Sequence, residues 1–320
     1  MRKACLDMVY ELAKRDPRVF FIGSDLGAGT LQQFKDEMPD RFLMEGVSEA
    51  NIIGIAAGLA LDGKIPYVNT IATFLTRRCF EQIVVDLCLH DVNVRLIGNG
   101  GGLVYAPLGP THLAIEDIAI LRAIPNMTIV APADAEEMCR FMPRTLEYQG
   151  PIYIRLAKGG DPVVTCPEHP FAIGRAIVMR EGTDALIVTT GVALKSALDA
   201  ATLLGERGVA ATVLHVPTIK PLDTEAILTC AADVPVVVTI EEHSVIGGMG
   251  SAVAEVVAEA GFSPGKQFRR IGIPDRFPDQ YGSQASLMER CAITTARLVE
   301  VVTELADRVG TPTAPRRSSV

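Results

Sequence analysis

Residues 127–158, MTIVAPADAEEMCRFMPRTLEYQGPIYIRLAK, contain two short apolar runs on either side of a helical pattern. The outer runs, MTIVAPAD and PIYIRLAK, have the length and the β-branched content of strands buried on both faces. The segment between them, AEEMCRFMPRTLEYQ, spaces its apolar residues as an amphipathic helix does. A strand, a helix and a second strand in this order predict two parallel strands joined by a crossover helix.

The same alternation continues on both sides of this unit. Before it we expect strands at 18–26, 65–74 and 93–100, and helices at 1–18, 51–63, 77–90 and 112–124. After it we expect strands at 184–191, 208–216 and 234–243, and helices at 193–208, 223–232 and 249–261. The sequence therefore predicts an α/β protein of two doubly wound domains.

A break in this pattern marks the domain boundary. At GGDPVVTCPEHPF, residues 159–171, glycine and proline cluster and the periodicity stops. We expect a first domain at 1–165, a linker at 166–181 and a smaller second domain at 182–308, followed by a flexible tail at 309–320.

The composition limits the class of protein. With 320 residues, 48% of them hydrophobic and 21% charged, the chain can bury two sizeable cores. A formal net charge of −8 and the lack of a basic amphipathic run argue against nucleic-acid and membrane partners. The seven cysteines are scattered and form no CxxC pair, which is typical of reduced thiols in a cytoplasmic protein. The glycine-rich GNGGGLVY suits a phosphate cradle only weakly, because it lacks the GxGxxG and Walker spacings.

Four segments in a fixed order carry a family resemblance. They are FLMEGVSEANIIGIAAGLALDGKIPYVNTIATFLTRRCFEQI (42–83), LGPTHLAIEDIAILRAIPNMTIVAPAD (108–134), GPIYIRL (150–156) and EEHSVIGGMGSAVAE (241–255). Together they resemble the transketolase-like, thiamine diphosphate-dependent enzymes over roughly residues 1–305. The resemblance implies a pyrimidine-binding fold followed by the smaller transketolase C-terminal domain.

The resemblance also implies a partner chain. Full-length members carry a diphosphate-binding domain with a GDG motif and a downstream Asn, and this sequence has no GDG. The chain thus resembles the C-terminal subunit of a split transketolase. Thiamine diphosphate would lie between two polypeptides, with Mg²⁺ and the diphosphate held mainly by the N-terminal subunit and no metal ligand supplied here. The expected assembly is a heterotetramer with two copies of each chain, in which this chain also dimerises with itself.

Glu49 follows Ser48 and precedes the helical pattern ANIIGIAAGLAL. By residue type alone it is an acid in the first turn of a helix, where the macrodipole favours negative charge. In the family, the matching glutamate bonds the ring nitrogen of the cofactor's aminopyrimidine. The resemblance therefore makes Glu49 catalytic and cofactor-binding, because proton sharing there favours the imino tautomer that generates the C2 carbanion, which attacks a ketose.

Phe74 and Phe80 flank two arginines in FLTRRCF. Aromatic residues of this kind ordinarily pack in a core. The resemblance makes both phenylalanines candidates for the apolar wall against the pyrimidine, Phe74 above all. Arg77 stands where transketolases usually have another aromatic residue and where deoxyxylulose-phosphate synthase-like relatives favour an arginine, so the resemblance makes it a cofactor-binding candidate. Arg78 could occupy this position equally well.

His112, in LGPTH, would by residue type alone be a polar residue just inside a helix capped by Thr111. The family histidine that it matches lies beside the cofactor's C2 atom. There it bonds substrate hydroxyls and stabilises charge on the carbonyl oxygen. The resemblance therefore assigns His112 to catalysis and to substrate binding, and we expect the helix after it to fix the loop.

Further residues match the family around this site. Arg2 and Arg155 match phosphate-binding arginines, whose planar fork suits phosphate, although a surface ion pair would explain either equally well. Asp25, in GSDL, matches a cofactor-binding aspartate, although Asp is also common in turns. Residues 241–243, in EEHSVIGGMG, belong to the C-terminal domain, which in this family builds the subunit interface, so we assign them no catalytic role.

Three departures from the family pattern concern the substrate. Leu108 stands where transketolases have an aspartate that reads the acceptor's hydroxyl, and Gly100 stands where they have a phosphate-binding histidine. Their phosphate-binding serine falls at Gly29 or Thr30. The sequence therefore predicts an altered anion site and poor use of a standard pentose phosphate acceptor.

The function implied by the resemblance is transfer of a two-carbon ketol unit from a ketose donor, phosphorylated or not, to an aldehyde or other acceptor. Two enzymatic alternatives are a deoxyxylulose-phosphate synthase-like activity and the β-type subunit of a 2-oxoacid dehydrogenase. The segments FLTRRCFEQ and GPTH favour the transketolase branch. A non-catalytic scaffold is the third alternative, against which the retained Glu49, Phe74 and His112 argue.

Overall fold

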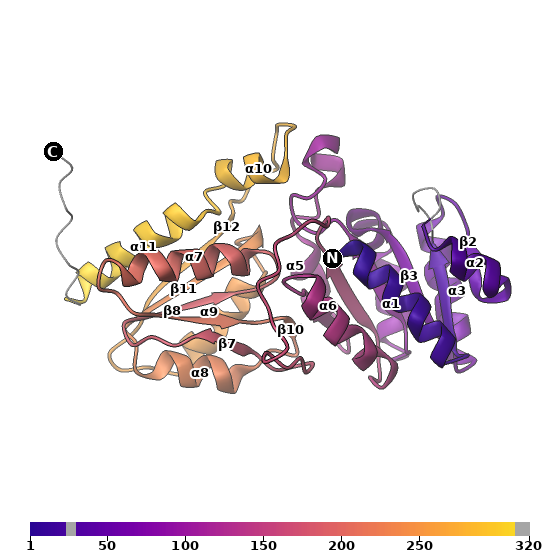
Figure 1. Ribbon diagram of the computed structural model, residues 1–320, viewed down its shortest axis with the longest axis horizontal. Helices are drawn as coiled ribbons and strands as arrows, with labels where there is room; N and C mark the ends of the chain where they lie inside the picture. Colours follow the sequence, from indigo (N-terminus) through magenta and orange to yellow (C-terminus); the bar gives the residue numbers. More distant parts are fainter. Residues whose placement is uncertain (24–29, 311–320) are drawn as a thin grey trace.

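The computed structural model describes residues 1–23 and 30–310 and shows two α/β domains side by side (Figure 1). Within these residues the first domain has a seven-stranded sheet in the order β10-β5-β6-β4-β3-β1-β2. Its parallel strands are β1 (Val19–Gly23), β2 (Phe42–Met44), β3 (Ile65–Ile71), β4 (Arg95–Asn99), β5 (Thr128–Val130) and β6 (Ile152–Leu156). β4, β5 and β6 are buried throughout, which explains why most of their residues are apolar.

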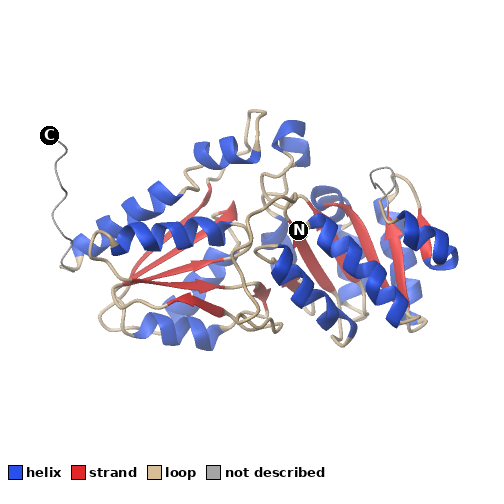
Figure 2. Cartoon of the chain, viewed as in Figure 1, coloured by secondary structure: helices blue, strands red, loops and turns tan. Residues whose placement is uncertain are grey.

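Helices cover both faces of this sheet (Figure 2). α1 (Arg2–Arg15) and α6 (Ala135–Phe141) share one apolar cluster, while α3 (Glu49–Leu61) and α5 (Asp117–Arg122) share the cluster on the other face. The remaining α- and π-helical segments described in this domain are α2 (Gln32–Glu37), α4 (Phe80–Gln82), and two π-helical turns at Phe74–Arg78 and Ile83–Cys88. The described residues also contain 3₁₀ turns at Pro39–Arg41, Ala106–Leu108, Pro110–His112 and Met142–Leu146. None of the described helices is long and apolar enough to cross a membrane.

The second domain has, among the described residues, a five-stranded sheet in the order β12-β11-β8-β9-β7. Its strands are β7 (Ile177–Arg180), β8 (Ala185–Thr189), β9 (Ala211–His215), β11 (Val236–Ser244) and β12 (Gln267–Ile273), and only β7 is antiparallel to its neighbour. α7 (Ala193–Gly205) and α11 (Thr295–Arg308) cover one face, and α8 (Thr224–Ala232) and α9 (Met249–Glu259) the other. The segment predicted as a linker contains β7, and sequence periodicity missed β12, α10 (Gln284–Arg290) and α11.

The two domains share a sheet and a core. β10 (Thr218–Lys220) lies in the second half of the chain but pairs antiparallel with β5, so it extends the first sheet. Lys220 Nζ donates to the carbonyl of Arg122 at 3.0 Å, and His215 Nε2 lies 2.9 Å from Glu137 Oε2 across the junction. One apolar cluster contains buried residues from α3 and α5 together with β8, β9 and α9. The domains are therefore packed as one unit.

The helix predicted at 112–124 is shorter than expected. His112 ends a 3₁₀ turn (Pro110–His112), and α5 begins only at Asp117. Between them, Ala114 exchanges backbone hydrogen bonds with Gly102, and the carbonyl of Ile115 accepts from the backbone N–H of Ser244. The prediction of an unbroken helix was wrong because tertiary partners take the backbone groups that a helix would use.

Candidate active site

Glu49 is the first residue of α3, as the sequence predicts, and its side chain is only 3% exposed. Arg78 Nη1 donates to Glu49 Oε2 at 2.6 Å. Among the described residues, the other carboxylate oxygen accepts no hydrogen bond. A buried carboxylate held by one cation thus keeps an oxygen for a further partner.

The π-helical turn Phe74–Arg78 separates the two adjacent arginines. Arg77 turns away from Glu49 and pairs with Glu116, and its Nη2 also donates to the carbonyl of Leu113 at 2.8 Å. Arg78 lies 4.6 Å above the ring of Phe74 while it binds Glu49. Of the two arginines that the sequence could not tell apart, Arg78 is the one beside Glu49.

His112 joins the same group of side chains from a different loop. Its ring lies edge-on to Phe74, with 5.2 Å between ring centroids, and its Nδ1 is 2.9 Å from Thr111 Oγ1. The contacts therefore run without a gap from Glu49 through Arg78 and Phe74 to His112. We call these four residues the Glu49–His112 cluster. Phe74 and His112 are half-buried and Arg78 is exposed, so the cluster faces solvent on one side.

The other predicted site residues are not gathered into this cluster. Phe80 lies on α4 with 39% of its surface exposed, and Arg2 begins α1 beside Met1. Asp25 and Gly29 fall outside the described residues. Leu108 is 48% exposed in the short 3₁₀ turn before His112.

The glycine run before His112 makes room for neighbouring side chains, so packing explains it without a phosphate. Gly100 has φ +76°, and a Cβ there would overlap the ring of Tyr105. A Cβ on Gly101 would lie 2.6 Å from Arg155 Cγ, and one on Gly102 would lie 2.7 Å from the carboxyl carbon of Glu242. The absence of a histidine at position 100 therefore has a steric cause.

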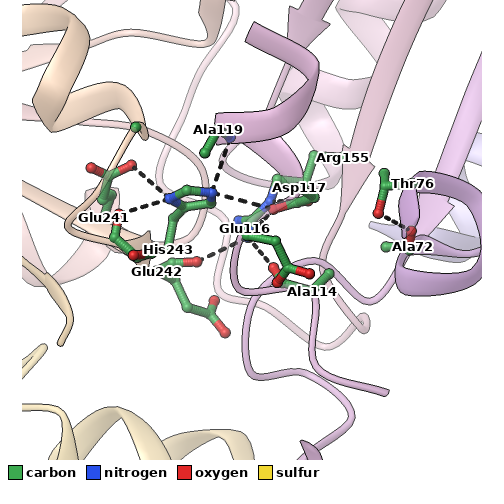
Figure 3. A network of polar contacts seen from close by, with 12 residues as sticks. Ala72, Thr76, Ala114, Glu116, Asp117, Ala119, Arg155, Glu241, Glu242 and His243 are labelled. Atoms are coloured by element: carbon green, nitrogen blue, oxygen red, sulfur yellow. Dashed lines mark hydrogen bonds and ion pairs between the residues drawn. The ribbon is translucent and has the colours of Figure 1, made fainter. Parts of the chain in front are cut away.

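Arg155, expected at a phosphate or on the surface, is buried at the domain junction (Figure 3). Its Nε donates to Asp117 Oδ2 at 2.8 Å, and its Nη2 donates to Asp117 Oδ1 at 3.2 Å and to the carbonyl of Glu242 at 2.9 Å. Tyr153 O–H donates to Asp117 Oδ2 at 2.7 Å, and His243 Nε2 lies 3.8 Å from Oδ1. This geometry favours a role between the domains over direct contact with substrate, and it corrects the expectation of a surface ion pair.

The charges of this network stabilise each other. Burial by itself raises the pKa of Asp117, but the charges of Arg155 and His243 and the hydrogen bonds from Arg155 and Tyr153 hold it below its usual value. Burial disfavours the charged form of Arg155, yet Asp117 raises its pKa above the usual value. Sequence reasoning missed Asp117; the available signal was an arginine inside a buried strand, which needs an acidic partner somewhere.

Comparison with known proteins decides the family. Residues 1–160 match the family described as "Transketolase, pyrimidine binding domain", and residues 174–298 match "Transketolase, C-terminal domain". The chain belongs to the transketolase family. Thiamine diphosphate is the cofactor of this family, and the Glu49–His112 cluster lies wholly in the domain named for binding its pyrimidine.

Two relatives and one solved structure show which members of the family this chain is similar to, and over what length. It is 37% identical over 309 residues to "6-deoxy-6-sulfo-D-fructose transketolase subunit SqwH" of Clostridium sp. (strain MSTE9), covering 96% of this chain and 95% of that protein. A structure described as "Split gene transketolase, inactive beta4 tetramer" is similar with a TM-score of 0.88 and 36% identity, over 96% of this chain and 98% of that chain. The "1-deoxy-D-xylulose-5-phosphate synthase" of Synechococcus sp. (strain JA-2-3B'a(2-13)) is 39% identical over 284 residues, but these span 87% of this chain and only 43% of the synthase. The chain is therefore similar over nearly its whole length to a transketolase subunit, and to less than half of the synthase.

The buried Asp117 should be essential to stability. Asp117→Ala leaves the Arg155 guanidinium buried without its counter-charge, which typically costs about 3–5 kcal/mol of unfolding free energy. Because the folded pKa of Asp117 is lowered, its contribution is complete above the usual value of 3.8 and is lost as the pH falls through the folded value. Urea denaturation at neutral and acidic pH measures both effects.

Glu116→Ala is the matched control. Glu116 is adjacent in sequence and pairs with the half-exposed Arg77, so its loss should cost less than about 1 kcal/mol. Equal destabilisation by the two variants would contradict the special weight given to the Arg155–Asp117 pair.

Proposed function

We propose that this chain is the pyrimidine-side subunit of a two-chain transketolase that moves a two-carbon ketol unit from a ketose to an aldehyde or other acceptor. The observation that carries the proposal is the continuous set of contacts from Glu49 through Arg78 and Phe74 to His112. Thiamine diphosphate, when bound, supplies the nucleophilic carbon that cleaves the bond next to a ketose carbonyl.

The residues present fit the pyrimidine end of that cofactor. Glu49 is a buried carboxylate with an oxygen left for a hydrogen bond, as a protonated ring nitrogen requires. Phe74 offers an aromatic surface against which a flat heterocycle can pack. Arg78 keeps Glu49 in place through its hydrogen bond, and its own position over Phe74 fixes the guanidinium. We also propose Phe80 and Asp25 as cofactor contacts.

His112 would act on the substrate. When Thr111 O–H donates to His112 Nδ1, the ring proton resides on Nε2 and can be donated to a substrate oxygen. A donor in that place orients the ketose hydroxyls and stabilises the negative charge that develops on the carbonyl oxygen. Arg2 is the arginine that we retain for an anionic substituent, since the Nε and Nη2 donors of Arg155 are bound to protein groups.

A partner chain completes the enzyme in this proposal. The relatives support it, because one is named a subunit and the other is described as a split-gene transketolase in the form of an inactive β4 tetramer. Within the described residues no group of His, Cys, Asp and Glu is arranged to hold a metal ion. In this proposal the partner mainly holds Mg²⁺ and the diphosphate. The active form would be a heterotetramer with two copies of each chain, located in the cytoplasm.

A synthase-like activity is the second candidate, supported by the 39% identity to deoxyxylulose-phosphate synthase. The same cluster serves both reactions, so the cluster does not separate them. The complex should turn over ketoses in preference to pyruvate, because the full-length similarity is to the transketolase subunit. Faster turnover of pyruvate would favour the synthase.

Glu49 gives the sharpest chemical test. In the reconstituted complex, Glu49→Gln should slow hydrogen–deuterium exchange at the cofactor's C2 atom by at least about a hundredfold, since an amide cannot share a proton with the ring nitrogen. Nuclear magnetic resonance of the acid-quenched cofactor measures this exchange. Glu45→Gln is the control, because Glu45 is an exposed carboxylate four residues earlier. Unchanged exchange in Glu49→Gln would end the assignment.

Cofactor affinity tests the need for a partner. The isolated chain should bind thiamine diphosphate with Mg²⁺ weakly or not at all, because it provides only the pyrimidine side. Calorimetric titration of the chain alone and of the complex compares the two affinities. Tight Mg²⁺-dependent binding by the chain alone would contradict the proposed division of the site.

Acceptor choice tests the departure at Leu108. A leucine cannot hydrogen-bond an acceptor hydroxyl, and one such bond involving a charged group is worth about 1.5–3 kcal/mol. Ribose 5-phosphate should therefore be used roughly ten- to a hundredfold less efficiently than by an ordinary transketolase. Leu108→Asp should recover part of kcat/KM, whereas the control Leu108→Ala should not. Position 100 offers no such rescue, because Tyr105 occupies its space.

A further inference from the structure

Residues 100–114, here called the His112 loop, lead from the end of β4 towards α5 and are pinned at both ends. The N–H groups of Gly100 and Gly101 donate to the carbonyl of Leu156 at 3.1 and 2.9 Å. Gly102 and Ala114 exchange two hydrogen bonds of 3.0 and 3.1 Å, which close the loop at its base. The position of His112 therefore depends on what holds the residues between these two points.

A series of turns connects the start of the loop to His112. Ala106 N–H donates to the carbonyl of Leu103 at 3.0 Å, Gly109 N–H to that of Ala106 at 3.2 Å, and His112 N–H to that of Gly109 at 3.0 Å. The N–H of Leu103, at the head of the series, donates to Glu242 Oε1 at 2.6 Å. Glu242 belongs to β11, in the other domain.

The second domain also encloses the loop. The side chains of Leu103, Ala106 and Leu113 are buried in the same apolar cluster as core residues of β11 and α11. Gln284, at the start of α10, donates from Nε2 to both carboxylate oxygens of Glu242, at 3.0 and 2.9 Å. In Figure 1, α10 lies beside the turns of this loop at the top of the molecule.

We propose that Glu242, supported by Gln284, is a positioning residue that holds the His112 loop and thereby sets where His112 meets the substrate. The inference rests on the proposed function for the role of His112, but the anchor itself does not. It gives the C-terminal domain a direct part in active-site geometry, which the resemblance to known transketolases does not assign.

The Glu242 carboxylate is buried, so its ionised form destabilises the folded chain. Within the described residues its carboxylate forms no ion pair, although Arg155 bonds its backbone carbonyl and Asp117 and Cys291 lie near it. Glu241 and His243 are its neighbours along β11, where successive side chains point to opposite faces of the sheet. Burial raises the pKa of Glu242 to about 7, against the lowering effect of Arg155 and of the bonds from Leu103 and Gln284.

The sign of this shift gives a pH dependence. The pKa of Glu242 in the folded chain lies above the usual value of 4.5. Between pH 4.5 and about 7 the folded chain therefore binds more protons at this residue than the unfolded chain does. As a result, the free energy of unfolding falls as the pH rises through this window. The ionised carboxylate accepts from both Leu103 and Gln284, while protonation removes one acceptor. The loop should thus be held best above about pH 7, where the anchor costs the most stability.

The experiment compares three variants in the full chain. Glu242→Gln keeps an oxygen for Leu103 but cannot ionise, Glu242→Leu removes the acceptor, and Glu241→Gln is the control. Glu241 is a buried carboxylate on the same strand that accepts instead from Met249 and Gly250 N–H at the start of α9. Amide hydrogen exchange by mass spectrometry follows residues 100–114, without cofactor, substrate or partner. Steady-state kinetics across neutral pH follows the reconstituted complex.

For wild type we expect kcat to rise as the pH passes about 7. Glu242→Gln should lose this rise and unfold at a higher temperature than wild type in alkaline buffer. Glu242→Leu should speed exchange in the His112 loop and lower kcat roughly ten- to a hundredfold with little change in KM, because a small displacement of an orienting group has effects of that size. Glu241→Gln should change neither the pH profile nor the exchange of the loop.

Two results would overturn the proposal: an unchanged pH profile in Glu242→Gln, or unchanged exchange of the His112 loop in a folded Glu242→Leu. The exchange data also keep the two hypotheses apart. A wild-type complex without ketol transfer, combined with faster loop exchange in Glu242→Leu, would refute the proposed function and leave the anchor standing.

Discussion

The buried ion pair between Arg155 and Asp117 stands at the centre of the polar contacts between the two domains. It joins the end of β6 to the start of α5. Of the two further hydrogen bonds from Arg155, one goes to the carbonyl of Ala114 and the other reaches the backbone of β11 in the second domain. Such a pair gains little over an apolar contact when intact but is costly to break, so it acts mainly by excluding other arrangements. Here it fixes β11, and with it Glu242, against the loop that carries His112.

The same geometry explains features of the sequence that suggest a ligand at first sight. Glycines at 100–102 leave space for Tyr105, Arg155 and Glu242, so their spacing records the close packing of neighbours. Buried polar groups at the junction are satisfied chiefly by one another and by the backbone, as the low-dielectric interior requires. The residues of the Glu49–His112 cluster differ, because three of the four remain partly open to solvent. This openness suits a surface that another molecule completes.

The C-terminal domain also packs directly against the first domain and the loop that carries His112. β10 extends the first domain's sheet, His215 meets Glu137, and the His112 loop is packed into the second domain's apolar cluster. A change in the second domain that moves β11 or α10 should therefore also move the loop that carries His112. Under the proposed function, in which His112 contacts the substrate, this packing holds the loop in place for that role.

The sequence by itself determined the α/β class, the strands buried on both faces and the family, because these follow from local periodicity and from motifs contiguous in the chain. It also singled out Glu49, Phe74 and His112, yet it could not choose between Arg77 and Arg78, since that choice depends on the rotation of a π-helical turn. Only the tertiary structure decided the short length of α5, the pairing of β10 with β5 and the pairing of Arg155 with Asp117. In each, the deciding partner is distant in sequence, and no local pattern records which distant group will satisfy a buried charge or a backbone hydrogen bond.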